Sequence, residues 1–135
     1  MSRQHFVIVF DGGCIGNPGR GYGSYAIDAG GGAPMVRRLD FDGRTTNNEA
    51  EYDTLIAALS YLTESLQMQG VSPSSVTVDV RGDSQLVINQ VTGRWKARNP
   101  RMAERRDRVL ELVKRFKNVT FRQHPRSESV RWLGH

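Results

Sequence analysis

The segment Phe6-Val7-Ile8-Val9-Phe10-Asp11-Gly12-Gly13-Cys14 constrains how the rest of the chain folds. Its first five residues are all apolar, which is typical of a central strand that is buried on both faces. Asp11 stands where the apolar run stops, and the two glycines after it allow a ligand to come close to the backbone. An acid at the end of a central strand is a candidate cation site for a substrate that carries phosphate. The alternative is an ordinary exit from a strand into a turn, where Asp-Gly is common.

The length and composition indicate one soluble domain. The chain has 135 residues, of which 38% are hydrophobic, so it is long enough to bury a core without disulfides or structural metals. It contains no apolar run near the roughly 18 residues that a membrane helix needs. The first residues lack the apolar region of a signal peptide, and Cys14 is the only cysteine. We therefore expect a cytoplasmic protein without an intrachain disulfide.

The positive charge is concentrated in one segment. The formal net charge is +5, and residues 94–108 alone contain seven basic and two acidic residues. A concentrated basic patch favours a polyanionic partner, and nucleic acid is the first expectation. The alternative is a solvated helix face, which is the more common origin of an isolated run of charges.

The first half of the chain predicts three strands and a helix. Strands at residues 6–10, 22–28 and 35–41 follow one another through short turns, which predicts an antiparallel meander. Thr46 and Glu49 then fit a capping box at the start of a helix. The apolar residues of this helix recur at helical spacing and define its buried face, at Leu55, Leu59, Leu62 and Leu66.

The second half predicts a fourth strand at residues 76–81, where valines alternate with polar residues and a second acid, Asp83, follows. A short helix over residues 85–91, a helix after Asn99-Pro100 and a last strand at residues 119–121 come next. Residues 124–135 carry no firm assignment. The expected architecture is therefore an α/β (mixed α+β) fold, with helices packed on a mixed sheet.

Helical geometry separates two candidate glutamates. Glu51 precedes Leu55 by four residues and lies about 40° from the apolar stripe, whereas Glu49 lies about 240° away. Glu51 is therefore expected to face the strand ends. The alternative is that it only interacts favourably with the positive end of the helix dipole. Asp11, Glu51 and Asp83 would then converge if the two Asp-bearing strands are parallel neighbours. Close carboxylates repel unless a cation lies between them, and Mg²⁺ prefers such oxygen ligands.

These residues resemble type 1 ribonuclease H. The likeness rests on Asp11-Gly12-Gly13-Cys14 with Asn17-Pro18-Gly19, on Thr45-Thr46-Asn47-Asn48-Glu49-Ala50-Glu51, and on Asp83-Ser84-Gln85, in the family's order. It covers nearly the whole chain and resembles the compact branch, which lacks a basic protrusion. The resemblance implies a single ribonuclease H domain over residues 1–135, with a five-stranded sheet in the order 3-2-1-4-5 and helices on both faces.

The resemblance also implies the reaction, the cofactors and the partner. The expected reaction is hydrolysis of the RNA strand of RNA–DNA hybrids, which leaves a 5′-phosphate and a 3′-hydroxyl. The expected cofactors are two Mg²⁺ or Mn²⁺ ions, held by Asp11, Gly12, Glu51 and Asp83. Asp11 would bridge both ions, and Arg126 would complete the catalytic set. We expect a monomer that needs no membrane and no small-molecule cofactor.

Further positions match family contacts to the hybrid. The matching residues are Gly12, Gly13, Cys14, Asn17, Asn47, Asn48 and Gln85. Amides suit this role because they both donate to and accept from the 2′-hydroxyl, the group that distinguishes RNA from DNA. Helix capping is the alternative for the two neighbouring asparagines. Arg94, Trp95 and Lys96 are a partial replacement for the missing protrusion, with Trp95 either stacking on the substrate or packing in a local core.

The C-terminus departs from the family pattern PRxxNxxADxLA, in which the aspartate is the fourth acid. The chain reads Pro125-Arg126-Ser127-Glu128-Ser129-Val130-Arg131-Trp132-Leu133-Gly134-His135. Counted without a gap, Ser129 stands at the asparagine position and Leu133 at the acid position. Aligned on the terminal Leu-Gly, the acid position is Arg131. Neither residue is a carboxylate, and the helix expected there is cut short.

Three consequences of this departure remain open. In the first, Asp11, substrate phosphate and water suffice to hold the metal that lacks a protein ligand, with lower activity or a preference for Mn²⁺. In the second, Glu128 or His135 supplies the missing ligand. In the third, the chain is a hybrid-binding relative that has lost catalysis. Arg126 matches the arginine that the compact branch has in place of a proton-shuttling histidine, and His124 is the alternative for that role. An arginine cannot act as a base near neutral pH, so it would steer phosphate or water. A protein-interaction domain is the third class of function, and clustered acids count against it.

Overall fold

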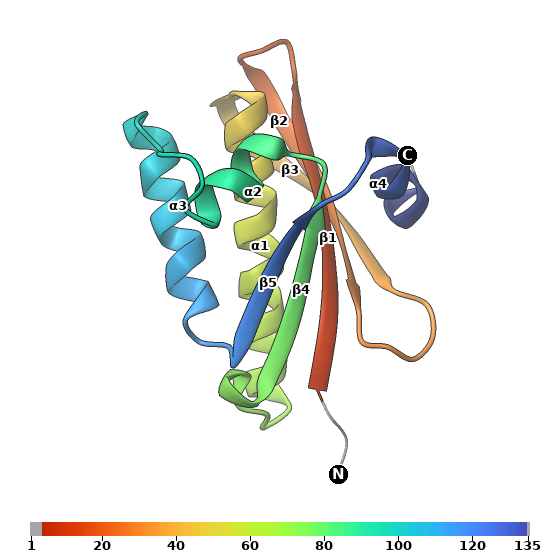
Figure 1. The fold of residues 1–135 in the computed structure, drawn as a ribbon. Coiled ribbons are helices and arrows are strands. Elements are labelled where there is room, and N and C mark those ends of the chain that lie inside the picture. The colour runs from red at the N-terminus through yellow and green to blue at the C-terminus, as the bar shows by residue number, and fades with distance from the viewer. Residues whose placement is uncertain (1–3, 135) are drawn as a thin grey trace.

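The computed structural model describes residues 4–134, which form a mixed sheet with helices on both faces (Figure 1). The strands are β1 (Gln4–Ile15), β2 (Gly19–Asp28), β3 (Met35–Thr45), β4 (Val76–Gly82) and β5 (Asn118–Gln123). The helices are α1 (Asn47–Met68), a 3₁₀ turn η1 (Pro73–Ser75), α2 (Gln85–Val91), α3 (Pro100–Val113) and α4 (Arg126–Leu133). This order confirms the predicted succession of elements and adds α4 in the region that carried no assignment.

The sheet has the predicted topology. Its five strands lie in the order β3-β2-β1-β4-β5, with β1, β2 and β3 antiparallel and with β4 parallel to both β1 and β5. The parallel ladder between β1 and β4 ends at the pair Phe10–Gly82. Asp11 is the next residue of β1 and Asp83 is the residue that follows β4, so the topology alone brings both to the same end of the ladder.

One expectation about β1 is wrong. Asp11 does not lie at the end of the strand, because β1 runs on to Ile15, which pairs with Arg20 of β2. Gly12 and Gly13 are paired with β2 as well, and this antiparallel partner satisfies the backbone groups that β4 no longer reaches. Asp11 therefore projects from a strand that is held on one side and open on the other.

The core lies between the sheet and α1. Ile8 and Phe10 of β1 are fully buried, as are the predicted Leu55 and Leu59 on α1, while Leu62 and Leu66 are 3% and 1% exposed. Val9 points to the other face of β1, where it packs with Ala26 and with Leu133 of α4. Figure 1 shows α4 on the opposite side of the sheet from α1. The apolar run of β1 is thus covered on both faces, as its composition predicts.

The capping box fixes where α1 begins. Thr46 accepts a hydrogen bond from the Glu49 N–H at 3.2 Å, and the Glu49 carboxylate accepts one from the Thr46 N–H at 2.9 Å. Glu49 is 2% exposed and also pairs with Arg101 and Arg105 of α3. Burial alone would raise the pKa of Glu49, but the Thr46 N–H and the two arginines together lower it.

Glu49→Gln is therefore expected to lower the free energy of unfolding at pH 7 by about 1–2 kcal/mol. A lowered native pKa stabilises the fold above the unfolded-state pKa, and this contribution is lost as the pH falls through the native pKa. Urea unfolding at pH 7 and at steps down to about pH 2 measures the difference, which should shrink with acidification. Glu64→Gln, at an exposed position of the same helix, is the matched control and should show little change. An equal loss at every pH would contradict an ionic origin.

Among the helices of residues 4–134, none combines the length and the apolar character needed to cross a membrane.

Candidate active site

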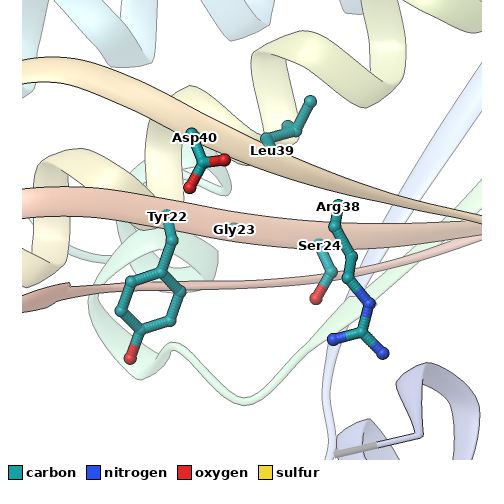
Figure 2. Close-up of a pocket in the computed structure, with 6 residues that line it drawn as sticks. All are labelled: Tyr22, Gly23, Ser24, Arg38, Leu39 and Asp40. Carbon is teal, nitrogen blue, oxygen red and sulfur yellow. The ribbon is translucent and has the colours of Figure 1, made fainter.

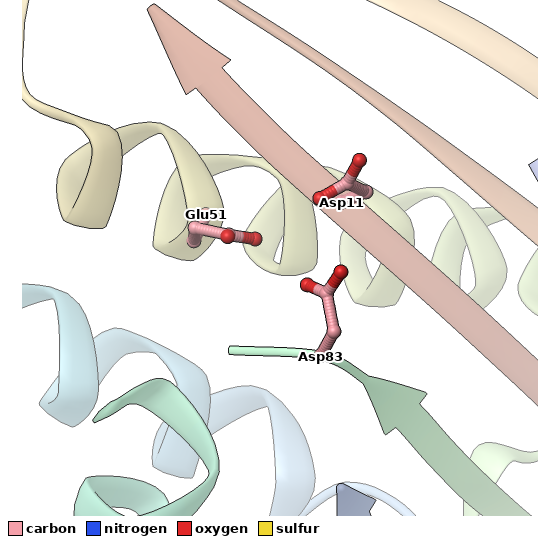
Figure 3. A group of neighbouring side chains, drawn as sticks. All are labelled: Asp11, Glu51 and Asp83. Carbon is pink, nitrogen blue, oxygen red and sulfur yellow. The ribbon is translucent and has the colours of Figure 1, made fainter. Parts of the chain in front are cut away.

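Three carboxylates from different elements converge beside the open edge of β1. Asp11 comes from β1, Glu51 from the second turn of α1, and Asp83 from the residue that follows β4 (Figure 3). One oxygen of each side chain lies within 4.8 Å of the others. The sequence-based prediction of a shared acidic site is therefore met by the geometry.

Two glycines allow this close approach. The Gly12 N–H donates to Glu51 Oε2 at 3.1 Å. A Cβ at Gly12 would lie 2.6 Å from the Ala50 carbonyl oxygen, so any side chain here would push β1 and α1 apart. At Gly82, directly before Asp83, a Cβ would lie 2.6 Å from the ring of Phe10. The positions of Glu51 and Asp83 thus depend on glycines, because a side chain at Gly12 or Gly82 would collide with its neighbours.

The electrostatics of the cluster favour a bound cation. Burial, together with the nearby charges of Asp11 and Asp83, raises the pKa of Glu51 to about 9, while the Gly12 N–H and Arg126 act in the lowering direction. Carboxylate oxygens are the ligands that hard divalent cations such as Mg²⁺ and Mn²⁺ prefer. A divalent ion would favour the ionised Glu51 carboxylate, against the effects of burial and of the two neighbouring acids. The donor set therefore fits the metal that the sequence predicts.

Arg126 reaches the same cluster from α4. Its Nη1 lies 3.4 Å from the Asp11 carboxylate and 3.5 Å from Asp83 Oδ2. The side chain is 65% exposed, so it remains accessible to a substrate as well. The other candidate for this role, His124, hydrogen-bonds through Nε2 to Ser129 Oγ at 2.9 Å. Burial lowers the pKa of His124, although the charges of Asp83 and Glu128 act against it.

Several predicted hybrid-contacting residues gather at the N-terminus of α1. Asn47 Oδ1 accepts a hydrogen bond from the Cys14 N–H at 3.0 Å, and the Asn47 N–H donates to Asn17 Oδ1 at 3.2 Å. These bonds join the β1–β2 turn to the helix start. Asn48 is exposed beside them, and Gln85 is exposed at the start of α2. Thr46 holds the cap, so the alternative of capping by the asparagines is not met.

The basic segment divides into two parts with different surroundings. Trp95 is 44% exposed, which excludes the alternative that it is a core residue, and Arg94 and Lys96 beside it are exposed too. Gln90 anchors this loop by accepting from the Tyr52 hydroxyl at 2.7 Å and donating to the Lys96 carbonyl at 3.3 Å. In α3, by contrast, Arg101 and Arg105 pair with acids of α1. Part of the charge run is therefore structural.

The structure shows the surroundings of Leu133 and Arg131, the two residues that the alignments place at the position of the fourth acid. Leu133 is 2% exposed and packs on Val9 and Ala26, on the face of the sheet away from α1. Arg131 is exposed and pairs with Glu128 at 3.3 Å. Among residues 4–134, the acidic group that could hold a metal consists of Asp11, Glu51 and Asp83, and Glu128 is not in it. His135 lies outside the described residues.

A hollow that the sequence did not suggest opens on β2 and β3. It has a volume of about 360 Å³ and is lined by Tyr22, Gly23, Ser24, Arg38, Leu39 and Asp40 (Figure 2). Ser24 is the strand partner of Asp11, and Arg38 is the partner of Ser24. The hollow therefore lies next to the candidate site on the neighbouring strands. In the sequence, its residues look like ordinary strand positions, and no motif distinguishes them.

Comparison with known proteins points to one family. Residues 10–131 match the family described as reverse transcriptase-like. A ribonuclease HI of Halobacterium salinarum is 38% identical over 122 residues, which are 90% of this chain and 57% of the relative. The chain thus spans little more than half the length of that curated protein.

Solved structures agree with this assignment. The crystal structure of RNase H1 from H. salinarum superposes with a TM-score of 0.80 at 35% identity, covering 94% of this chain and 90% of that one. LC11-RNase H1 in complex with an RNA/DNA hybrid also gives 0.80, at 34% identity and with 93% and 89% coverage. At this identity and coverage, the likeness extends beyond the fold to the family.

Proposed function

The chain belongs to the type 1 ribonuclease H family, and from that premise we propose that it hydrolyses the RNA strand of RNA–DNA hybrids with divalent cations. The observation that carries the proposal is the convergence of three carboxylates within 4.8 Å at the edge of the β1–β4 ladder. Such a cluster costs stability in a metal-free protein, which makes a purely structural role a poor explanation.

The three acids have the role of holding the metal. We assign two ions, Mg²⁺ or Mn²⁺, to Asp11, Glu51 and Asp83, with the backbone of Gly12 beside them. Two such ions stabilise the attacking and the leaving oxygens of a phosphodiester during hydrolysis. The chain's contribution is to fix the carboxylates in advance, through the Gly12–Glu51 hydrogen bond and the strand register.

The neighbouring residues orient the hybrid. Because Asn47 Oδ1 accepts from the Cys14 N–H, the amide nitrogen of Asn47 is left to donate to a ligand. Asn17, Asn48 and Gln85 lie at the same end of the molecule and suit the 2′-hydroxyls of the RNA strand. Arg94 and Lys96 would contact phosphates, with exposed Trp95 stacking on a sugar or base. Arg126 would steer the phosphate toward the acids.

A second candidate function is a hybrid-binding module with weak or no catalysis. The observation that favours it is that Leu133, at a position where the family pattern expects an acid, is apolar and buried against Val9 and Ala26. This candidate keeps the nucleic-acid contacts and loses one protein ligand to the metal.

A cleavage assay on a 5′-labelled RNA–DNA hybrid, with Mg²⁺, with Mn²⁺ and with EDTA, tests the proposal. We expect cleavage of the RNA strand only with a divalent ion, and products with 5′-phosphate and 3′-hydroxyl ends. Single-stranded RNA and duplex DNA serve as control substrates. Tight binding without cleavage would favour the binding module. Weak binding that does not fall with added salt would instead indicate a protein-interaction domain, because phosphate contacts release counterions.

A further inference from the structure

Arg126 lies where the proposed function places a cation. Its nitrogen Nη1 is 3.4 Å from the Asp11 carboxylate and 3.5 Å from Asp83 Oδ2. Asp11 and Asp83 are two of the three acids that could hold a metal. The guanidinium group and a divalent ion would therefore bind to the same two carboxylates.

The fold delivers this arginine to the cluster through two anchors. His124, two residues before Arg126, donates its backbone N–H to the Gly82 carbonyl at 2.9 Å, which ties the chain to the end of β4. At the other end of α4, Leu133 and Trp132 pack on β1 and β2. Arg126 is the first residue of the helix between these anchors, and its side chain lies beside Asp11 and Asp83.

The ion pairs of Arg126 with the two aspartates are long and exposed on the arginine side, so they can be broken at low cost. Hydrogen bonds between charged groups usually measure about 2.7–2.9 Å, and those of Arg126 are longer. Its side chain is 65% exposed, whereas those of Asp11 and Asp83 are 8% and 14% exposed. The arginine can therefore swing into solvent without disturbing the core, while the two acids stay in place.

We propose that Arg126 is a built-in competitor of the divalent cation: it neutralises Asp11 and Asp83 in the metal-free protein and must leave them when a metal binds. The inference rests on the proposed function only for the assignment of the metal to these acids. Arg126 then sets the metal affinity, and its charge becomes available to the substrate once the metal has taken its place.

Isothermal titration calorimetry with MnCl₂, and separately with MgCl₂, tests the competition on metal binding alone. Arg126→Gln removes the competitor, and we expect it to bind metal about threefold to thirtyfold more tightly than the wild type, as the release of two exposed ion pairs allows. Arg126→Lys keeps the charge and should stay closer to the wild type. Arg131→Gln is the matched control, since it removes the same charge from the same helix at a pair with Glu128.

Thermal unfolding gives a second readout on the same proteins. In EDTA, Arg126→Gln should unfold at a lower temperature than the wild type, because its carboxylates repel without a partner. With saturating MnCl₂, the gain in melting temperature should be larger for this variant. Unchanged or weaker metal affinity in Arg126→Gln would overturn the proposal, as would an equal gain in Arg131→Gln. If the wild type cleaves no hybrid but Arg126→Gln still binds Mn²⁺ more tightly, the competition stands and the proposed reaction fails.

Discussion

Asp11→Asn is expected to reduce cleavage of an RNA–DNA hybrid by about a thousandfold or more, while the protein stays folded. Asp11 lies within β1, where it pairs with Ser24 of β2, and its carboxylate lies in the acidic cluster, 3.4 Å from Arg126 Nη1. Asparagine has the same shape but no charge. The change therefore removes the charge of a proposed metal ligand without altering the packing of β1.

The measurement is the initial rate of RNA-strand cleavage at saturating Mg²⁺, with hybrid binding measured in parallel. Asp42→Asn is the matched control, because it makes the same replacement at an exposed position of β3. It should retain the wild-type rate. We expect the melting temperature of Asp11→Asn in EDTA to stay close to that of the wild type, since the change removes both the pair with Arg126 and the repulsion between Asp11 and Asp83. A rate within tenfold of the wild type would mean that this cluster is not the site of the reaction.

Leu133→Asp is expected to lower the free energy of unfolding by about 3–5 kcal/mol without improving metal affinity. Counted from Arg126, position 133 is where the family pattern has its fourth acid. In this chain, however, Leu133 is 2% exposed and packs on Val9 and Ala26. An aspartate would therefore be buried as an unpaired charge in an apolar contact.

Val130→Asp is the matched control for this prediction. It lies on the same helix, three residues earlier, and is 41% exposed, so the same acidic group would remain in water there. We expect urea unfolding to show a small change for Val130→Asp, within about 0.5 kcal/mol, and a large one for Leu133→Asp. Calorimetry with MnCl₂ should give unchanged affinity for both. Tighter Mn²⁺ binding by Leu133→Asp would show that this position does face the metal site.

The sheet, the first helix and the acidic cluster were predictable from sequence because each has a strong local signal. Alternating or continuous apolar residues mark β1 and β4, and Thr46 with Glu49 marks the start of α1. The position of Glu51 relative to Leu55 follows from helical periodicity, and the order of the strands follows from the family resemblance. Asp11 and Asp83 both follow the last pair of the parallel β1–β4 ladder, so they lie at the same end of it.

Other features depend on distant parts of the chain and were not predictable in this way. The extension of β1 past Asp11 is decided by its partner β2, because the two glycines alone would suit a turn. The destination of Leu133 depends on the apolar face that Val9 and Ala26 present, which no local pattern in residues 124–135 reveals. The charge run of residues 94–108 reads as one patch, yet Arg101 and Arg105 are taken up by acids of α1 that lie about fifty residues away.

The central claim is that Asp11, Glu51 and Asp83 hold the divalent ion on which hydrolysis depends. X-ray diffraction from crystals of the protein soaked in MnCl₂ tests it most directly, because manganese scatters anomalously and its position is then seen without assumptions. We expect an anomalous peak among these three side chains, with carboxylate oxygens at bonding distance and Arg126 turned away from Asp11. No peak in the cluster at saturating Mn²⁺, or a peak bound by other residues, would contradict it.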